Sequence, residues 1–294
     1  MNLFANAEIE TQSDKIVNVA SVPQRSPFRY PGGKTWLVPV ARKWLKSRKV
    51  RELVEPFAGG GIISLTAAFE QLADRVTMVE FDNQVAAVWE TILNGGNQRL
   101  ADRIVGFEMT AESVMSVLSQ TDMSREELAF QTILRNRVNH GGILAPGSGL
   151  LKHGENGKGL KSRWYADTLY KRIVLIGHVR DAIRFIHGDG MEVLREYRES
   201  VDTCFFIDPP YTAAGKKAGK RLYAHSELDH ELLFKLAADL RGDFLMTYDN
   251  AQGVEDLARK HNFDMQLVGM KNTHHAEMTE LLISRDLDWV RRAQ

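Results

Sequence analysis

The chain has 294 residues, and its 38 lysine and arginine residues are balanced by 38 aspartate and glutamate residues, so the formal net charge is zero. This balance excludes a protein that binds nucleic acid through overall charge alone, and any basic surface must be local. The single cysteine, Cys204, excludes an internal disulfide framework and a multi-cysteine zinc site, and it is typical of a reducing compartment. No apolar segment is long enough to cross a membrane and residues 1–15 lack a signal-peptide pattern, so we expect a soluble, cytoplasmic protein.

The order of polar and apolar segments indicates an α/β fold. Residues 1–25 are polar without a clear period, which predicts a mobile tail. Beyond Val50, short apolar runs alternate with longer helix-like stretches, as in the βα units of a largely parallel sheet. The predicted strands are 53–57, 76–80, 183–188, 204–208, 243–248 and 280–284.

The first motif, FRYPGGK (28–34), places an aromatic residue and a lysine on either side of a Gly-Gly turn. The Tyr30 ring can stack on a purine and Lys34 can reach a carboxylate, so the two suit an amino-acid-bearing nucleoside. A β-turn followed by a surface lysine is the structural alternative.

A strand, a glycine turn and a helix follow in LVEPFAGGGIISLTAAFE (53–70). Gly59 and Gly61 let backbone amides approach a ligand, and the helix start adds partial positive charge. The next strand ends in Glu80, about 20 residues on, where dinucleotide-binding units carry an acid for ribose hydroxyls. With Glu55 ahead of it and no G-x-G-x-x-G spacing, the turn suits an adenosine cofactor without a pyrophosphate. An ordinary strand-to-helix junction is the alternative.

The central part of the chain interrupts this βα rhythm. SREELAFQTILRNRVN (124–139) opens with a capping box of Ser124 and Glu127 and reads as a helix that Gly141 and Gly142 end. A long glycine-rich, basic stretch without helical or strand period comes next, and such loops in compact domains are usually functional. We interpret roughly 105–171 as an inserted subdomain.

The stretch TCFFIDPPYTAAGKK (203–217) predicts a strand that stops at a rigid corner. Proline cannot donate to a sheet ladder, so the strand must end at Asp208, and Pro209 with Pro210 stiffens the exit. An acid, a backbone carbonyl and the Tyr211 ring then share one small volume. A stiff turn without a ligand is the alternative.

Three motifs thus follow in one order: FRYPGGK, EPFAGGG (55–61) and DPPY (208–211). This set resembles the D12-class, Dam-like adenine-specific DNA methyltransferases, whose target-recognition segment lies between the last two motifs. The resemblance covers nearly the whole chain beyond the tail, including TELLISR (279–285). It implies a Rossmann-like methyltransferase fold with a mostly parallel central sheet, a catalytic domain of 26–104 and 172–294, and a mainly helical and loop target-recognition insertion at 105–171.

The resemblance also implies S-adenosyl-L-methionine as the cofactor, duplex DNA as the partner and no metal. The resemblance further implies a bacterial or phage-encoded cytoplasmic enzyme that is a monomer or a weak dimer. Whether a companion restriction endonuclease exists is left open. The positions that match family cofactor contacts, together with Glu55, are Tyr30, Lys34, Glu55, Phe57, Gly59, Gly61, Glu80, Asp189 and Asp208. For Asp189, an ordinary turn acid is an equal alternative.

The catalytic positions implied are Asp208, Pro209, Pro210 and Tyr211. The Asp208 carboxylate and the Pro209 carbonyl can accept the two hydrogens of adenine's exocyclic amine and stabilise its developing positive charge. Tyr211 offers a ring face for a base swung out of the duplex.

Basic and amide side chains in the insertion and in the loop after DPPY are suited to phosphates and base edges. The predicted DNA contacts are Arg135, Arg137, Asn139, His140, Lys152, Lys158, Lys161, Arg163, Lys216, Lys217, Lys220 and Arg221. A solvated surface loop is the alternative for the lysine-rich segment.

Three other functions remain to be weighed. A methyltransferase acting on RNA or on a protein amide would use the same cofactor, although glutamine-modifying members typically carry Asn in place of Asp208. A catalytically silent DNA-binding relative would keep the fold. A nicotinamide oxidoreductase is the most distant alternative, and it would bind a dinucleotide in place of S-adenosylmethionine.

Overall fold

The computed structural model describes residues 11–12, 21–29, 33–145, 147–151, 154, 157, 159–210, 228–271 and 277–291. Its strands form one eight-stranded sheet in the order β1-β7-β8-β6-β5-β2-β3-β4. They are β1 (Thr11–Gln12), β2 (Glu52–Glu55), β3 (Arg75–Glu80), β4 (Ile183–His187), β5 (Thr203–Ile207), β6 (Asp243–Asp249), β7 (Asp264–Lys271) and β8 (Glu277–Ser284).

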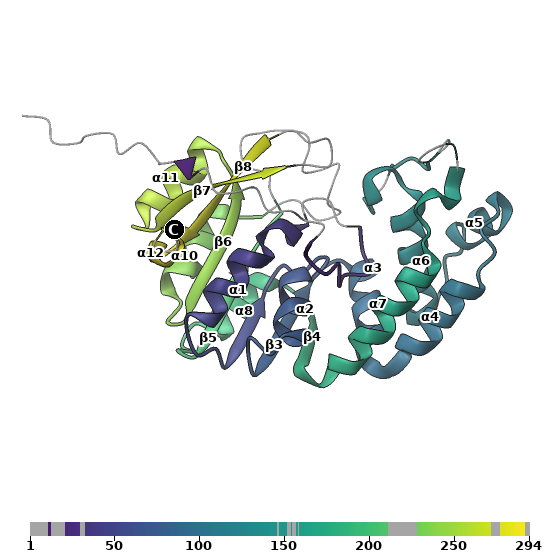
Figure 1. The fold of residues 1–294 in the computed structure, drawn as a ribbon, viewed down its shortest axis with the longest axis horizontal. Coiled ribbons are helices and arrows are strands. Elements are labelled where there is room, and N and C mark those ends of the chain that lie inside the picture. The colour runs from purple at the N-terminus through teal and green to yellow at the C-terminus, as the bar shows by residue number, and fades with distance from the viewer. Residues whose placement is uncertain are drawn as a thin grey trace, which may run out of the picture.

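The helices alternate with these strands and also form a separate group beyond β3 (Figure 1). The α-helices are α1 (Val38–Lys46), α2 (Ile62–Phe69), α3 (Asn83–Thr91), α4 (Asn97–Gly106), α5 (Ala111–Leu118), α6 (Arg125–Val138), α7 (Ala166–Val179), α8 (Gly190–Glu196), α10 (His230–Asp239), α11 (Gln252–Lys260) and α12 (Asp288–Arg291). Shorter helical turns are η2 (Lys34–Leu37), η3 (Ile92–Gly96), η4 (His140–Gly142), η6 (Gly159–Arg163) and η7 (Arg180–Ala182).

The sheet is mostly parallel, as predicted. Strands β2 to β6 pair in parallel with one another, and β1 pairs in parallel with β7. Only β8 runs against its neighbours, β6 and β7, among the described strands. This order and the covering helices confirm the predicted Rossmann-like α/β fold.

All six predicted strands are present, with bounds shifted by up to three residues. The sequence reading missed β7, because Gln266 and Gly269 interrupt its apolar pattern and its hydrogen bonds depend on β8. The sequence also predicted a mobile tail up to residue 25, whereas packed structure begins before that residue. Val22, inside the expected tail, is only 4% exposed and belongs to the core.

Two apolar cores lie on opposite faces of the sheet, because successive residues of a strand point to opposite sides. In β5, Cys204 and Phe206 pack into one core, and Phe205 and Ile207 into the other. Helices α1 and α2 contribute to the first core, and α8, α10 and α11 contribute to the second. Each face of the sheet is therefore covered by helices.

Helices α4 to α7 extend from the β4 side of the sheet (Figure 1). Buried residues of α4, α6 and α7, such as Ile104, Phe130 and Ile173, belong to the same core as α1 and α2. The predicted helix of 124–139 is confirmed as α6, and both halves of its capping box form between Ser124 and Glu127. These helices are thus packed against the sheet domain by a continuous apolar core.

No helix in the described part of the chain combines the length and apolar character that a membrane span requires.

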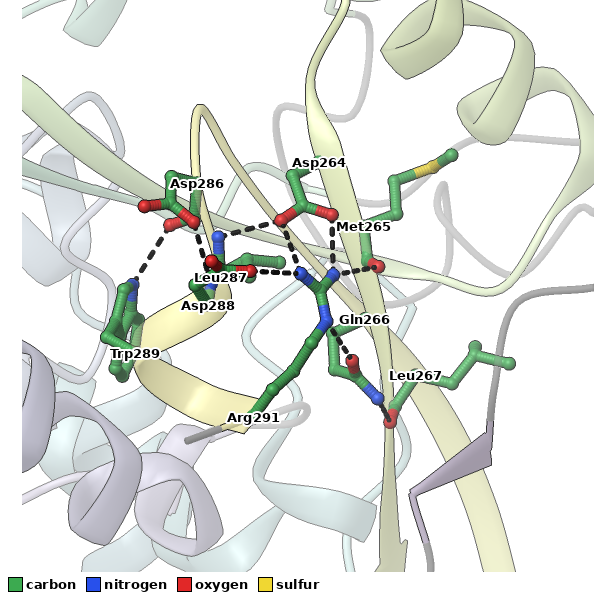
Figure 2. A network of polar contacts seen from close by, with 9 residues as sticks. All are labelled: Asp264, Met265, Gln266, Leu267, Asp286, Leu287, Asp288, Trp289 and Arg291. Carbon is green, nitrogen blue, oxygen red and sulfur yellow. Dashed lines mark hydrogen bonds and ion pairs between the residues drawn. The ribbon is translucent and has the colours of Figure 1, made fainter. Parts of the chain in front are cut away.

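A polar network fixes the last described helix, α12, to the beginning of β7 (Figure 2). Arg291 donates to both carboxylate oxygens of Asp264, over 2.6 and 2.9 Å, and to Asp288 over 3.2 Å. Asp264 also accepts the backbone N–H of Leu287 at 2.8 Å. Because Asp264, Asp286 and Asp288 bring their oxygens within 4.8 Å of one another, the guanidinium offsets a local excess of negative charge.

We expect Arg291→Ala to destabilise the protein by about 1 kcal/mol, since a bidentate but half-exposed pair is lost and the carboxylates repel. The melting temperature should fall by about 2 °C in a chain of this size. Arg259→Ala is the matched control, because Arg259 pairs only with acids of its own helix, Glu255 and Asp256. Equal melting temperatures of Arg291→Ala and the wild type would contradict the assigned contribution.

Candidate active site

The candidate site lies where the direction of strand addition reverses. From β2 the chain adds β3 and then β4 on one side, whereas β5 lies on the other side of β2 and is followed outward by β6. In open parallel sheets, ligands bind outside the carboxyl ends of the strands at such a reversal. Glu55 ends β2 and Asp208 follows β5, so the predicted site residues flank this point.

The glycine turn after β2 has the conformation that its composition predicts. Gly59 and Gly61 have φ of +48° and +60°, in the left-handed region that favours glycine. A Cβ on Gly61 would lie 2.5 Å from Cε of Met78 and 3.2 Å from the ring of Trp89. The Trp89 indole donates to the Gly59 carbonyl at 2.9 Å. The backbone of the turn therefore lies close to the side chains of Met78 and Trp89, and α2 begins immediately after the turn.

Glu80 supports this turn from β3. One carboxylate oxygen accepts the Gly59 N–H at 2.9 Å, and the other accepts the Asp82 N–H at 2.8 Å. Burial raises the pKa of Glu80 to about 7, although these backbone hydrogen bonds oppose the rise. The predicted contact of Glu80 with a ribose stays a prediction, and its observed role is to fix the turn.

Glu55 lies below the same turn and is 3% exposed. Its carboxylate accepts the Ser64 backbone N–H in the first turn of α2 at 3.0 Å. Burial raises its pKa to about 8; the Ser64 hydrogen bond opposes this, and the negative charges of Asp208 and Glu80 add to it. Glu55 was predicted to contact the cofactor, but in the structure it binds the helix start from inside the protein.

At the end of β5, the carboxylate of Asp208 is held by residues from two other elements, η2 and β6. Its Oδ1 lies 3.0 Å from Nζ of Lys34 and accepts a hydrogen bond of 2.8 Å from the Thr247 hydroxyl. Lys34 Nζ also lies 3.5 Å from Oε2 of Glu280, on β8. We call Lys34, Asp208, Thr247 and Glu280 the Lys34 cluster. Lys34 and Glu280 are 3% and 5% exposed, so the charges of the pair are almost fully buried.

This cluster gives Lys34 different partners from the one predicted. The sequence assigned Lys34 to the cofactor, whereas its ammonium points to two carboxylates of the protein. Burial lowers the pKa of Lys34, but Asp208 and Glu280 outweigh that effect, and the resulting pKa lies above the ordinary value. The sequence reading did not single out Thr247 or Glu280. Glu280 stood in the predicted last strand, yet nothing in its neighbourhood links it to Lys34.

Most of the remaining predicted cofactor and catalytic positions lie among the described residues, and two lie outside them. Asp189 is exposed and caps α8 by accepting the Met191 N–H at 2.8 Å. Phe57 is half-buried beside the second core, Pro209 is buried and Pro210 is half-buried. Tyr30 and Tyr211 lie outside the described residues.

The structure corrects two of the predicted DNA contacts. Arg137 and Asn139 are each only 4% exposed. Arg137 donates to the carbonyl of Pro27, and Asn139 donates to that of Ile143 at 2.8 Å. These polar side chains satisfy buried backbone carbonyls, so they are not placed to contact a nucleic acid.

The other predicted DNA contacts keep their assignments as predictions. His140 and Lys161 are exposed, and Arg163 is half-buried. Arg135, also half-buried, donates to Gln84 at 2.7 Å and Gln131 at 3.0 Å. The positions outside the described residues are Lys152, Lys158, Lys216, Lys217, Lys220 and Arg221.

Side chains of helices α6 and α7 form hydrogen bonds with the segment that leads into the first motif. Asn136, fully buried, accepts the Arg29 N–H at 2.8 Å and donates to the Arg29 carbonyl at 3.0 Å. Arg137 and Arg172 donate to the carbonyls of Pro27 and Ser26. Burial, followed by the charges of Arg172 and Arg29, lowers the pKa of Arg137 to about 9. The backbone of residues 26–29 is therefore bound by side chains of the helices between β3 and β4.

Residues 30–131 match the model of the D12 class N6 adenine-specific DNA methyltransferase family. No curated protein sequence matches the chain. The match contains EPFAGGG and most of FRYPGGK but does not reach DPPY, so it bears out the resemblance for the first two motifs, and with it the expectation of S-adenosylmethionine as methyl donor. Together with the sheet order, it indicates a methyltransferase of Rossmann-like fold.

Several solved methyltransferase structures are similar over most of the chain. The N-terminal domain of human METTL16 in complex with SAH is 10% identical, with 86% of this chain and 70% of that chain covered and a TM-score of 0.40. The rRNA methyltransferase aviRa from Streptomyces viridochromogenes is 11% identical, with 90% of both chains covered and a TM-score of 0.38. Precorrin-6y C5,15-methyltransferase from Geobacter metallireducens is 10% identical, with 95% and 94% covered and a TM-score of 0.38.

We expect Gly61→Ala to destabilise the protein by about 2 kcal/mol, because alanine strains at positive φ and its Cβ meets Met78. The affinity for S-adenosylmethionine should fall at the same time, as measured by isothermal titration calorimetry. Gly253→Ala is the control, since Gly253 lies in α11 with open space around its Cβ position. Wild-type stability and affinity in Gly61→Ala would contradict this account of the turn.

The raised pKa of Glu55 predicts a pH-dependent stability. A carboxyl group that titrates near 8 in the folded protein and near 4.5 when unfolded favours folding at low pH, and this contribution is lost as the pH rises through 8. Glu55→Gln keeps an acceptor for the Ser64 N–H and removes the titration. Its unfolding free energy relative to the wild type should rise from pH 5 to pH 8, on the order of a few kcal/mol. Urea denaturation at several pH values tests this, and a constant difference would refute it.

Proposed function

We propose that the protein is a site-specific DNA methyltransferase that transfers a methyl group to the exocyclic amine of adenine in duplex DNA. The observation that carries the proposal is the Asp208 carboxylate, held at the end of β5 by Lys34 and Thr247 and followed by Pro209, Pro210 and Tyr211. The family match over residues 30–131 supports adenine in DNA as the acceptor.

The glycine turn fits a cofactor with an adenosine and an amino-acid part. Gly59 and Gly61 adopt positive φ in front of the α2 N-terminus, and at Gly61 a Cβ would have no space beside Met78. S-adenosylmethionine, when bound, supplies an electrophilic methyl group on a positively charged sulfur. Among the described residues, Gly59, Gly61, Phe57 and Asp189 are our candidates for holding it. Glu55 and Glu80 act below them by fixing the backbone of the turn.

Asp208 and Pro209 supply the acceptors that the amine requires. The lone pair of the adenine amine is delocalised into the ring, so the nitrogen must become more tetrahedral before it attacks. The Asp208 carboxylate accepts one amine hydrogen, and the Pro209 carbonyl accepts the other. Both stabilise the positive charge that develops on the nitrogen. The prolines fix the backbone between these acceptors, since each restricts its own φ.

The target base has to leave the duplex for this reaction, because its amine cannot reach the cofactor within the stack. Tyr211 is our candidate for stacking against the extruded base. The basic residues of the predicted insertion other than Arg137, and those of the loop after DPPY, are candidates for the flanking phosphates and base edges. Their distribution suits an acidic partner on one side of a neutral protein.

The test is methyl transfer by the purified protein to duplex DNA and to RNA, with N6-methyladenine measured by mass spectrometry. We expect methylated adenine in DNA, and we expect Asp208→Ala to lower the rate by about 10³-fold or more with the fold intact. Asp256→Ala, an exposed acid on α11, is the control and should keep the wild-type rate.

Three outcomes would contradict the proposal. RNA as the sole acceptor would make the protein an RNA methyltransferase. DNA binding without methyl transfer to any acceptor would make it a silent relative. Near-normal turnover by Asp208→Ala would remove the assigned role of that carboxylate. Modification-sensitive sequencing of DNA from cells that express the protein would then identify the recognised sequence.

A further inference from the structure

The Lys34 cluster contains a carboxylate that the proposed chemistry does not use. Glu280 comes from β8, the antiparallel strand, and is 5% exposed. Its Oε2 lies 3.5 Å from Lys34 Nζ, whose distance to Asp208 is 3.0 Å. Burying a second carboxylate beside an ion pair that is already complete costs free energy, so its presence calls for a physical reason.

The charge of the cluster gives such a reason. Lys34 and Asp208 alone would form a neutral pair, and a neutral pair is a weak stabiliser of positive charge. With Glu280, one ammonium faces two carboxylates, and the formal charges of the four cluster residues sum to one negative charge. Methyl transfer from a sulfonium to an amine moves positive charge onto the nitrogen that faces Asp208, and a net negative site stabilises that charge.

Two other described titratable groups that interact with Asp208, Glu55 and Tyr248, do not supply this charge at neutral pH. Burial raises the pKa of Glu55 to about 8, so this carboxyl is mainly protonated at pH 7. Burial also raises the pKa of Tyr248 well above its ordinary value, which keeps its hydroxyl neutral. Lys34, in contrast, stays fully protonated because its pKa lies above the ordinary value.

We propose that Glu280 is a positioning residue that acts through Lys34: it shares the ammonium with Asp208 and so leaves the Asp208 end of the cluster net negative. Lys34 and the Thr247 hydroxyl both contact Oδ1 of Asp208, which fixes the rotation of the carboxylate. Thr247 and Lys34 thus set the direction of the catalytic carboxylate, and Glu280 sets its effective charge. This inference rests on the proposed function for the identity of the acceptor only.

The kinetic test compares Glu280→Gln with a double variant in which Lys34→Met is added. Glu280→Gln should lower kcat by about 10- to 100-fold and change KM for DNA by less than about 3-fold, since the charge acts on the transition state. The double variant restores one net negative charge, because it removes one cation and one anion. It should be at least about 5-fold faster than Glu280→Gln, although it is the more heavily mutated protein.

Two further variants separate the charge of Glu280 from its packing. Glu280→Asp keeps the charge and should retain kcat within about 3-fold, which keeps the proposal testable even if the glutamine variant folds poorly. Glu52→Gln is the matched control. Glu52 accepts a hydrogen bond from the Thr77 hydroxyl and lies at the amino end of β2, whereas Asp208 follows the carboxyl end of β5. It should leave kcat and KM unchanged.

A binding measurement decides the proposal without any methyl acceptor. S-adenosylmethionine carries a sulfonium charge that S-adenosylhomocysteine lacks, so a net negative cluster favours the first. The ratio of their dissociation constants should shift toward S-adenosylhomocysteine by about 3- to 10-fold in Glu280→Gln and return in the double variant.

Failure of this inference differs from failure of the proposed function. An absence of adenine methylation by the wild type would remove the function, and the binding ratio would still decide the role of Glu280. The inference is overturned by an unchanged ratio, by a kcat of Glu280→Gln within a factor of two of the wild type, or by a double variant no faster than Glu280→Gln.

Discussion

The structure depends most on one buried ammonium, that of Lys34, which lies between carboxylates from two different strands. Because Lys34 begins η2, Asp208 follows β5 and Glu280 lies in β8, a single charge holds together parts of the chain far apart in sequence. Removing the ammonium would leave two carboxylates uncompensated, which is costlier than leaving the whole group out. The three residues are therefore coupled, and the geometry of the strand end follows from their balance.

The acids that end β2 and β3, Glu55 and Glu80, show that carboxylates near a candidate ligand site can also stabilise the backbone. Glu80 and Glu55 each accept backbone N–H groups, the first at the glycine turn and the second at the start of α2. A glycine turn has little side-chain packing of its own, so these hydrogen bonds are what give it one conformation. Burial then raises both pKa values, because the protonated form is favoured away from water.

Local signals in the sequence predicted the parts of this protein that local chemistry determines. The glycine turn, the proline-terminated β5 and the capping box of α6 are all specified by neighbouring residues. What the sequence missed depends on tertiary packing. Strand β7 is defined by its pairing with β8, and the burial of Arg137 depends on which face of α6 meets residues 26–29. The contact between Lys34 and Glu280 joins residues from opposite ends of the chain, so no spacing in the sequence reveals it.

The hydrogen bonds from Asn136, Arg137 and Arg172 to residues 26–29 have a consequence for how such a protein can change during evolution. A group of helices beside a sheet is often regarded as an exchangeable module that can be transplanted between scaffolds. Here α6 and α7 hold residues 26–29, which precede Lys34 in the chain. Transplanted helices would therefore need to bring a matching N-terminal peptide with them, and lineages that change one of these segments are expected to change the other.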